Sequence, residues 1–182
     1  MYYSSYITLL TTIIENKMQE IKTFILLVVI TTFGSCQFNQ SVNKDLTTGA
    51  HSRGDGIGVD DISIQISGES DNRNEFIFGE KVNLVFNNVS GLTNSNGKTF
   101  PGLSMYIVKN EKDTILSNPN LLKSLNNGTD LSPLQLRASF ISALPNHNDE
   151  KYKVFVEITD KKGEGKFNYE LPFTVKKNKL LE

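Results

Sequence analysis

The fold of this chain is most clearly indicated by the stretch YKVFVEITDKKGEGKFNYELPFTV, residues 152–175. Apolar side chains alternate with other side chains on both sides of a polar, glycine-containing turn at 160–165. A period of two places one set of side chains on a buried face and the other in solvent, as in a half-buried β-strand. Two such strands joined by a short turn predict an antiparallel hairpin. Pro172 lacks the N–H that a ladder requires, so it predicts an edge or a bulge in the last strand.

The same period recurs in five segments upstream of this hairpin. They are DISIQIS at 61–67, EKVNLVFN at 80–87, LSMYIVKN at 103–110, DTILS at 113–117 and LQLRASFI at 134–141. Together with the hairpin they predict about seven strands and an all-β fold, an antiparallel β-sandwich. The predicted interior consists of apolar residues that share one face in each strand: Ile64, Val82, Leu84, Phe86, Met105, Ile107, Phe140, Val154, Val156, Phe167 and Phe173.

One segment predicts a short helix that crosses between the sheets. In NPNLLKSLNNG, residues 118–128, Asn118 can cap the helix and Pro119 suits its first position. Gly128 lies just past the predicted end, and the leucines of the segment would cover one end of the sandwich.

A different pattern precedes the strands, where the apolar run TFILLVVITTF at 23–33 leads to the only cysteine, Cys36. A spanning helix needs about 20 apolar residues, so the run is too short to cross a membrane. Lys22 before the run and small residues after it are typical of a secretory signal peptide. The pattern resembles the lipobox of bacterial lipoproteins, except that Phe33 stands where that family more often has Leu, Val or Ala. The resemblance implies that the Cys36 thiol receives a diacylglyceryl group and becomes residue one.

This interpretation divides the chain into four parts. Residues 1–35 are an upstream extension and a lipoprotein signal peptide with Met18 as the alternative start, and 36–60 are a lipidated, flexible polar tether. Residues 61–177 are the sandwich and 178–182 a tail. With its cysteine lipidated, the exported domain has no disulfide and depends on its apolar core. The alternative is a buried helix in which Cys36 is incidental.

The segments FGEKVNLVF at 78–86 and YKVFVEITDKKGEG at 152–165 resemble immunoglobulin-like or cadherin-like sandwiches of Bacteroidetes lipoproteins. This resemblance implies an architecture and a location in the cell envelope, not a chemistry. Surface-exported lipoproteins of that phylum resemble one another in an acidic stretch after the cysteine, whereas here no acidic residue lies between Cys36 and Asp45. We therefore expect an anchor in the outer membrane facing the periplasm, with surface exposure as the alternative. The triplet at 113–115 resembles the O-glycosylation motif of the same group, which implies Thr114 as a modified residue.

Few residues offer catalytic chemistry, because the only histidines are His51 and His147. A serine nucleophile needs a base beside it. That base would be His147, with Ser139 or Ser142 as the nucleophile, and no nucleophile-elbow pattern surrounds either serine. The sequence predicts a solvated loop histidine, no catalytic residue and no cofactor.

Three carboxylates near glycines, Asp55, Asp60 and Asp61, are weak candidate metal ligands. Their spacing does not match a calcium loop, and a site would need Asp160 or Asp149 brought close by the fold. The glycines more simply let the chain turn into the first strand, so the sequence predicts no metal site. The formal net charge is −1 and no basic stripe is present, so nucleic acid is not an expected partner.

The expected function is a lipid-anchored, non-catalytic binding or accessory module, with an envelope protein or glycan as its partner. The loop at 87–102 carries Leu92 and Phe100 among polar residues, and loops of such length often carry function. We expect this loop at the same end of the sandwich as the 160–165 turn. One alternative is a small envelope enzyme, a hydrolase or protease, which requires an essential polar cluster. The other is a structural subunit of an envelope or secretion complex, which requires an exposed strand edge or apolar patch.

Overall fold

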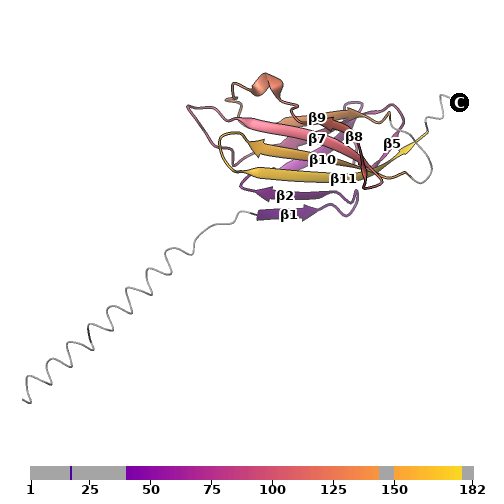
Figure 1. Ribbon diagram of the computed structural model, residues 1–182, viewed down its shortest axis with the longest axis horizontal. Coiled ribbons are helices and arrows are strands. Elements are labelled where there is room, and N and C mark those ends of the chain that lie inside the picture. Colours follow the sequence, from indigo (N-terminus) through magenta and orange to yellow (C-terminus); the bar gives the residue numbers. More distant parts are fainter. Residues whose placement is uncertain (1–16, 18–39, 144–149, 178–182) are drawn as a thin grey trace, which may run out of the picture. The chain divides into compact units, whose positions relative to one another are not determined.

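The computed structural model describes residue 17 and residues 40–143 and 150–177 (Figure 1). The predicted signal peptide, the alternative start Met18, the lipidation site Cys36 and the 178–182 tail lie outside the described residues, as do His147 and Asp149. Within the described part of the chain, no helix is long and apolar enough to cross a membrane.

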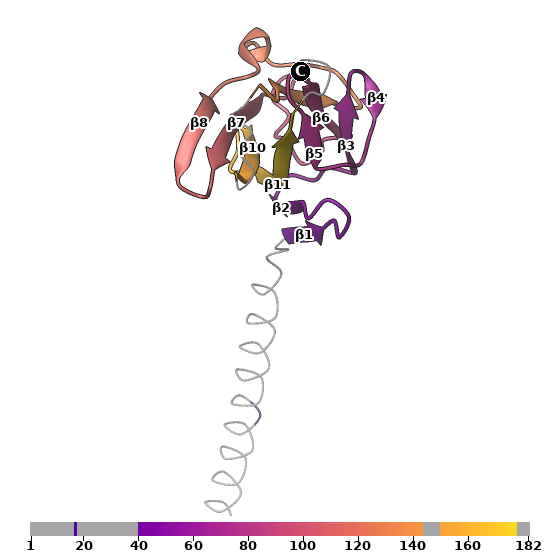
Figure 2. The ribbon, with the colours of Figure 1, turned by 90° about the vertical axis from the view of Figure 1, so that its right-hand side faces the viewer.

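The described strands form two sheets that face each other. The larger sheet has the order β1-β2-β11-β10-β7-β8, and β5 pairs in parallel with the end of β11. Its strands are β1 (Gln40–Lys44), β2 (His51–Asp55), β5 (Glu75–Ile77), β7 (Pro101–Lys109), β8 (Asp113–Asn118), β10 (Tyr152–Asp160) and β11 (Lys166–Lys176). The smaller sheet has the order β4-β3-β6-β9, from β3 (Asp61–Ile66), β4 (Glu69–Ser70), β6 (Lys81–Asn87) and β9 (Leu136–Ile141). Figure 2 shows β7, β8 and β10 on one side and β3, β4 and β6 on the other.

The architecture confirms the predicted all-β antiparallel sandwich, and each of the seven predicted segments forms a strand. Every residue predicted for the interior is buried. The fully buried ring of Phe86 packs edge-on against Phe167 and Tyr169 from the opposite sheet, with ring centroids 6.4 and 5.7 Å apart. A second aromatic cluster joins Phe76, Phe140 and Phe173 at centroid distances of 5.3 to 6.0 Å.

The predicted tether is wrong for residues 40–60, which belong to the sandwich. β2 pairs with β11 from His51 opposite Glu170 to Asp55 opposite Lys166, and β1 pairs with β2. Thr48 is 2% exposed, and Ala50 and Ile57 belong to the apolar core. The physical reason is that a polar segment can extend a sheet through backbone hydrogen bonds, which do not depend on hydrophobic periodicity.

The predicted helix over 118–128 is also wrong, because only Lys123–Leu125 makes a short 3-10 turn. The Oδ1 atom of Asn118 accepts from the Asn120 backbone N–H, and that of Asn120 accepts from the N–H of Leu122. Such local side-chain bonds offer the backbone an alternative to a helix. Leu121 and Leu122 nevertheless pack against the core, where the helix was expected to cover it.

Pro172 lies within an internal strand, whereas the sequence predicted an edge or a bulge at this position. The pairing of β2 with β11 ends at Glu170, and the pairing of β5 with β11 begins at Thr174. The N–H of Thr174 donates to Asn74 O on this side of β11. Since N–H directions alternate along a strand, the nitrogen of Pro172 points to the same side, into the gap between the two partners. The missing N–H therefore breaks no ladder hydrogen bond.

Candidate binding site at the loop end

The 87–102 loop and the 160–165 turn lie against each other, as the topology predicted. The backbone N–H of Thr93 donates to Asp160 Oδ2 over 2.7 Å. The N–H of Lys162 donates to Asp160 Oδ1 over 2.9 Å, and the N–H of Lys161 donates to Phe100 O over 2.9 Å. One buried carboxylate thus connects the loop to the turn.

Asp160 is 6% exposed, and each of its two carboxylate oxygens accepts a backbone hydrogen bond. Burial alone would raise the pKa of its carboxyl, but hydrogen bonds from Thr93, Lys162 and Gly163 outweigh burial and hold the pKa below its usual value. A Cβ added to Gly163 would come within 2.5 Å of Asp160 Oδ2 and of Thr93 Oγ1. Glycine at 163 therefore allows the close approach that this carboxylate requires.

The two predicted contact residues of the loop are partly engaged within the domain. Leu92 is half-buried and packs against the core. Phe100 is also half-buried, and its ring lies against Gly128, where an added Cβ would come 2.8 Å from Cε1. The Nζ atom of Lys162 lies 5.2 Å from the Phe100 ring centroid, within the range of a cation–π contact. The Phe100 ring is therefore held between Gly128 and Lys162 within the domain.

Beside the loop lies a hollow of about 380 Å³, between residues 88–99 and the segment 129–134. The sequence alone did not indicate this hollow, because its two walls are distant along the chain. Thr99 and Thr129 connect the walls through a reciprocal pair of backbone hydrogen bonds of 2.8 Å. The N–H of Gly97 donates to Asn94 Oδ1, and the N–H of Leu131 donates to Thr129 Oγ1. These bonds fix the shape of both walls.

The side chains that line the hollow are mostly polar and uncharged. They include the amides of Asn88 and Asn94, several hydroxyls, and the carboxylates of Asp60 and Asp130. Leu131, which is 63% exposed, adds an apolar contact surface. In the described structure the side chains of Asp60, Asn88 and Asp130 make no hydrogen bond with the protein, so they are free to meet a ligand.

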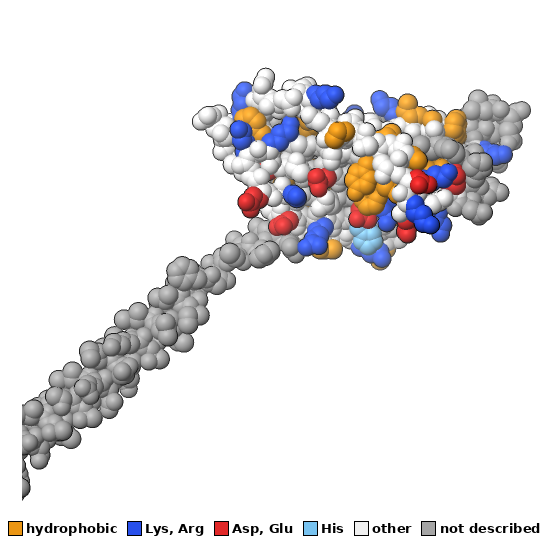
Figure 3. Space-filling view, in the orientation of Figure 1, with side chains coloured by type: hydrophobic (Ala, Val, Ile, Leu, Met, Phe, Trp, Pro, Cys, Tyr) orange, Lys and Arg blue, Asp and Glu red, His pale blue; other side chains and the backbone are white. Residues whose placement is uncertain are grey.

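The outer face of the larger sheet offers a second, flatter surface. The rings of Tyr106 and Phe155 stack there, with centroids 4.7 Å apart and planes inclined by 10°. Figure 3 shows apolar side chains gathered on this face, with charged groups around them. Burial, together with the charges of Glu170 and Glu157, raises the pKa of Tyr106. Because each ring faces the other, the stack presents ring edges rather than a flat apolar platform.

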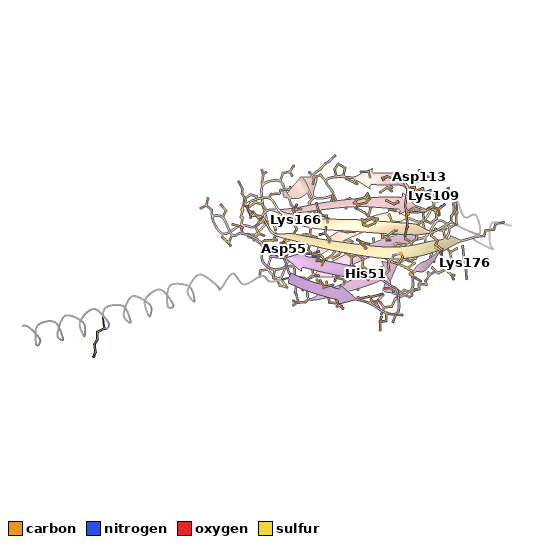
Figure 4. All side chains as sticks on the ribbon, turned by 60° about the horizontal axis from the view of Figure 1, so that its bottom comes forward. His51, Asp55, Lys109, Asp113, Lys166 and Lys176 are labelled. Atoms are coloured by element: carbon orange, nitrogen blue, oxygen red, sulfur yellow. The ribbon has the colours of Figure 1, made fainter. Side chains whose placement is uncertain are left out.

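The three weak metal candidates are divided between the two sheets. Asp55 lies on β2 opposite Lys166 (Figure 4), and Asp61 begins β3, where its Oδ2 accepts from Asn87 Nδ2 over 3.1 Å. Asp60 lies in the connection between them, on the rim of the hollow. Within the ranges that the structure describes, no three His, Cys, Asp or Glu side chains gather as a metal site requires. Asp149, which the calcium alternative also named, lies outside the described residues.

Both serines named as candidate nucleophiles donate hydrogen bonds within the domain. Ser139 Oγ donates to Asn83 Oδ1 over 2.8 Å. Ser142 is fully buried and donates to the backbone carbonyls of Ile77 and Glu80. His51 lies on the exposed face of β2, far along the chain from both. Thr114 is exposed on the edge strand β8.

Comparison with known proteins identifies the fold. No family model matches the sequence, and no curated protein shows significant sequence similarity to it. Among solved structures, the C-terminal domain of Wzt superposes with a TM-score of 0.52 at 11% identity, covering 77% of this chain and 80% of that one. A Niemann-Pick type C2 protein from the Japanese carpenter ant gives a TM-score of 0.41 at 14% identity, covering 65% and 96%. The Wzt likeness supports an immunoglobulin-like β-sandwich and carries no information about ligands.

Proposed function

We propose that this protein is a lipid-anchored, non-catalytic binding module of a bacterial cell envelope, similar in organisation to Bacteroidetes lipoproteins. The signal-peptide pattern that ends at Cys36 supports the anchor. The absence of acidic residues between Cys36 and Asp45 supports the periplasmic face of the outer membrane. The immunoglobulin-like sandwich supplies a rigid scaffold on which loops can form a recognition surface.

The observation that carries the binding function is the hollow beside the 87–102 loop. Its volume of about 380 Å³ is within the range of small-molecule sites, which is roughly 300–1,000 Å³. Its walls are fixed by hydrogen bonds, so a ligand need not order them on binding. The polar groups of Asp60, Asn88 and Asp130 project from a pre-formed frame without protein partners, which is the arrangement expected of a recognition site.

The chemistry of the hollow favours a glycan as the ligand. Amides offer both donors and acceptors, and carboxylates offer acceptors, so together they match the hydroxyl groups of a sugar. Leu131 can contact the apolar C–H face of a sugar ring. A hollow with few charges and no cationic side chain among its lining residues does not favour phosphate or nucleic acid.

The test uses the full lipidated chain and oligosaccharides released from the envelope of the source bacterium. We expect Asp130→Ala to weaken binding by about tenfold, which corresponds to roughly 1.4 kcal/mol. The matched control is Glu69→Ala, which removes an exposed carboxylate from the edge strand β4, and it should leave the affinity unchanged. Titration calorimetry measures both variants.

Two results would contradict the proposal. If the wild-type protein binds no envelope oligosaccharide, the ligand class is wrong. If the two variants lose affinity equally, binding occurs outside the hollow. If protease destroys the bound partner and its binding depends on Asp130, the site is correct but the ligand is an envelope protein rather than a glycan.

A second proposal concerns Thr114, which we infer to be O-glycosylated. Its exposure on β8 and its motif resemblance support this modification. Mass spectrometry of the native protein should find a glycan on the peptide that contains Thr114 and none after Thr114→Val.

A further inference from the structure

The hairpin of β1 and β2 carries the two most exposed large apolar side chains of the described structure. Val42 is 73% exposed and Leu46 is 87% exposed, whereas Leu131 and Ile141 follow at 63% and 58%. Val42 lies in the edge strand β1, and Leu46 lies in the turn that connects β1 to β2. Single exposed apolar residues are common on protein surfaces. Two of the most exposed ones on one short hairpin need a further explanation.

The turn is built so that Leu46 stays in the solvent. The Asp45 carboxylate accepts from the N–H of Thr47 over 2.8 Å and from Thr48 Oγ1 over 2.7 Å. The backbone N–H of Asp45 donates to Ala50 O, and the N–H of Gly49 donates to Asp45 O. The side chains of Thr48 and Ala50 are buried. These contacts fix the backbone on the C-terminal side of Leu46, whose own side chain lies in solvent.

Covalent geometry places this hairpin close to the proposed anchor. Only residues 37–39 lie between Cys36 and Gln40, the first residue of β1. An extended chain advances by at most about 3.6 Å per residue, so the Cα atoms of Cys36 and Gln40 lie within about 14 Å of each other. A lipid chain on Cys36 would therefore hold β1 near the headgroups.

We propose that the β1–β2 hairpin lies on the bilayer surface and inserts Val42 and Leu46 into the boundary between headgroups and acyl chains. This inference rests on the lipid anchor of the proposed function. The partner that we propose for the hairpin is the membrane that holds the lipid anchor. The covalent structure brings no other partner so close to the hairpin.

The polar groups of the hairpin suit a headgroup layer. Val42 lies opposite Arg53 and Lys44 lies opposite His51 in the β1–β2 register. Cationic side chains beside apolar ones are typical of segments that bind anionic lipid surfaces. The unpaired backbone groups along the outer edge of β1 can bond to headgroups and water, which the hydrocarbon core would not allow.

The test exploits the absence of tryptophan from the sequence, so one introduced tryptophan is the only one in the chain. Val42→Trp and Leu46→Trp are prepared as full lipidated chains, and Leu131→Trp at the exposed loop end serves as the matched control. Each protein is reconstituted into phosphatidylethanolamine–phosphatidylglycerol vesicles with or without bromine on the acyl chains. Bromine quenches tryptophan only at short range.

We expect brominated lipid to reduce the emission of Trp at 42 and 46 by about half or more and to leave Trp at 131 unchanged. Vesicle-bound protein with equal emission at all three positions would overturn the hairpin proposal and leave the lipid anchor intact. Protein that fails to float with vesicles would instead overturn the anchor, and the hairpin proposal with it. Cross-linking between copies through position 42, without quenching, would assign the edge to a second copy and also overturn the proposal.

Discussion

Replacement of Asp160 by alanine tests the connection between the recognition loop and the rest of the sandwich. The variant removes the acceptor of the Thr93 and Lys162 N–H groups, whose bonds to the carboxylate are 2.7 and 2.9 Å long. A hydrogen bond to a charged group contributes about 1.5–3 kcal/mol. Water can reach part of this turn and replace some of the loss, so we expect the free energy of unfolding to fall by about 2–4 kcal/mol. That is a large part of the roughly 5–15 kcal/mol by which a domain is stable.

The pH dependence separates the charge of Asp160 from its packing. The folded state holds the pKa of Asp160 below its usual value, whereas in the unfolded chain an aspartate titrates near about 3.9. The ionised carboxylate therefore stabilises the fold above about pH 4, and this contribution is lost as the pH falls through the lowered folded-state pKa. The difference between wild type and Asp160→Ala should be equal at about pH 7 and pH 5 and should shrink below about pH 4.

Urea denaturation followed by far-UV circular dichroism measures these free energies. Asp113→Ala, which removes an exposed carboxylate from the edge strand β8, is the control and should change stability by less than about 0.5 kcal/mol. If Asp160→Ala lowers the free energy of unfolding by the same amount at all pH values, packing and not charge accounts for the effect of the substitution. No loss at neutral pH would show that water satisfies the two N–H groups and that the carboxylate does not connect the loop to the turn.

Three further predictions concern the core, the turn and the anchor. Phe86→Ala removes a fully buried ring and should lower the free energy of unfolding by about 3–5 kcal/mol, whereas the exposed Lys112→Ala should leave it nearly unchanged in the same urea titration. Gly163→Ala should cost about 1–3 kcal/mol, because its Cβ would come within 2.5 Å of an Asp160 oxygen, and a thermal melt that matches wild type would contradict this. Cys36→Ser should abolish labelling by a fatty-acid probe and leave unprocessed precursor, and undiminished labelling would end the lipoprotein interpretation.

The sequence predicted those parts of the fold whose side chains alternate. In β10 every second residue is buried, as its sequence indicates, because the strand has one face on the core and one towards solvent. The three-residue strand β5 was missed, although its Phe76 is fully buried at the centre of an aromatic cluster. A strand so short shows no period, and its position depends on the parallel partner β11, which lies far along the chain.

The candidate site could be predicted only in part, because it too depends on contacts between segments that lie far apart along the chain. The sandwich topology correctly placed the 87–102 loop beside the 160–165 turn, since both connect strands at one end. The opposite wall of the hollow, 129–134, has no sequence signal that relates it to the loop. It reaches the loop through the pairing of Thr99 with Thr129, a non-local contact between two polar residues that carries no hydrophobic pattern.

Residues 40–60 were predicted to be a flexible tether from their polar composition, but composition does not show whether a segment can join a sheet. A polar, glycine-bearing segment cannot build a core of its own, and in isolation it would not repay the entropy of ordering its backbone. Here the exposed edge of β11 supplies a template of N–H and C=O groups, and the segment adds β2 and then β1 to it. Ala50 and Ile57 of this segment enter the core, and Val59 packs against it. Because β1 begins at Gln40, the sandwich starts within a few residues of the proposed anchor at Cys36. A domain held so closely presents a restricted set of orientations to the membrane. In the proposed arrangement, the exposed side chains of the β1–β2 hairpin determine which face of the sandwich rests on the bilayer and which end points away from it.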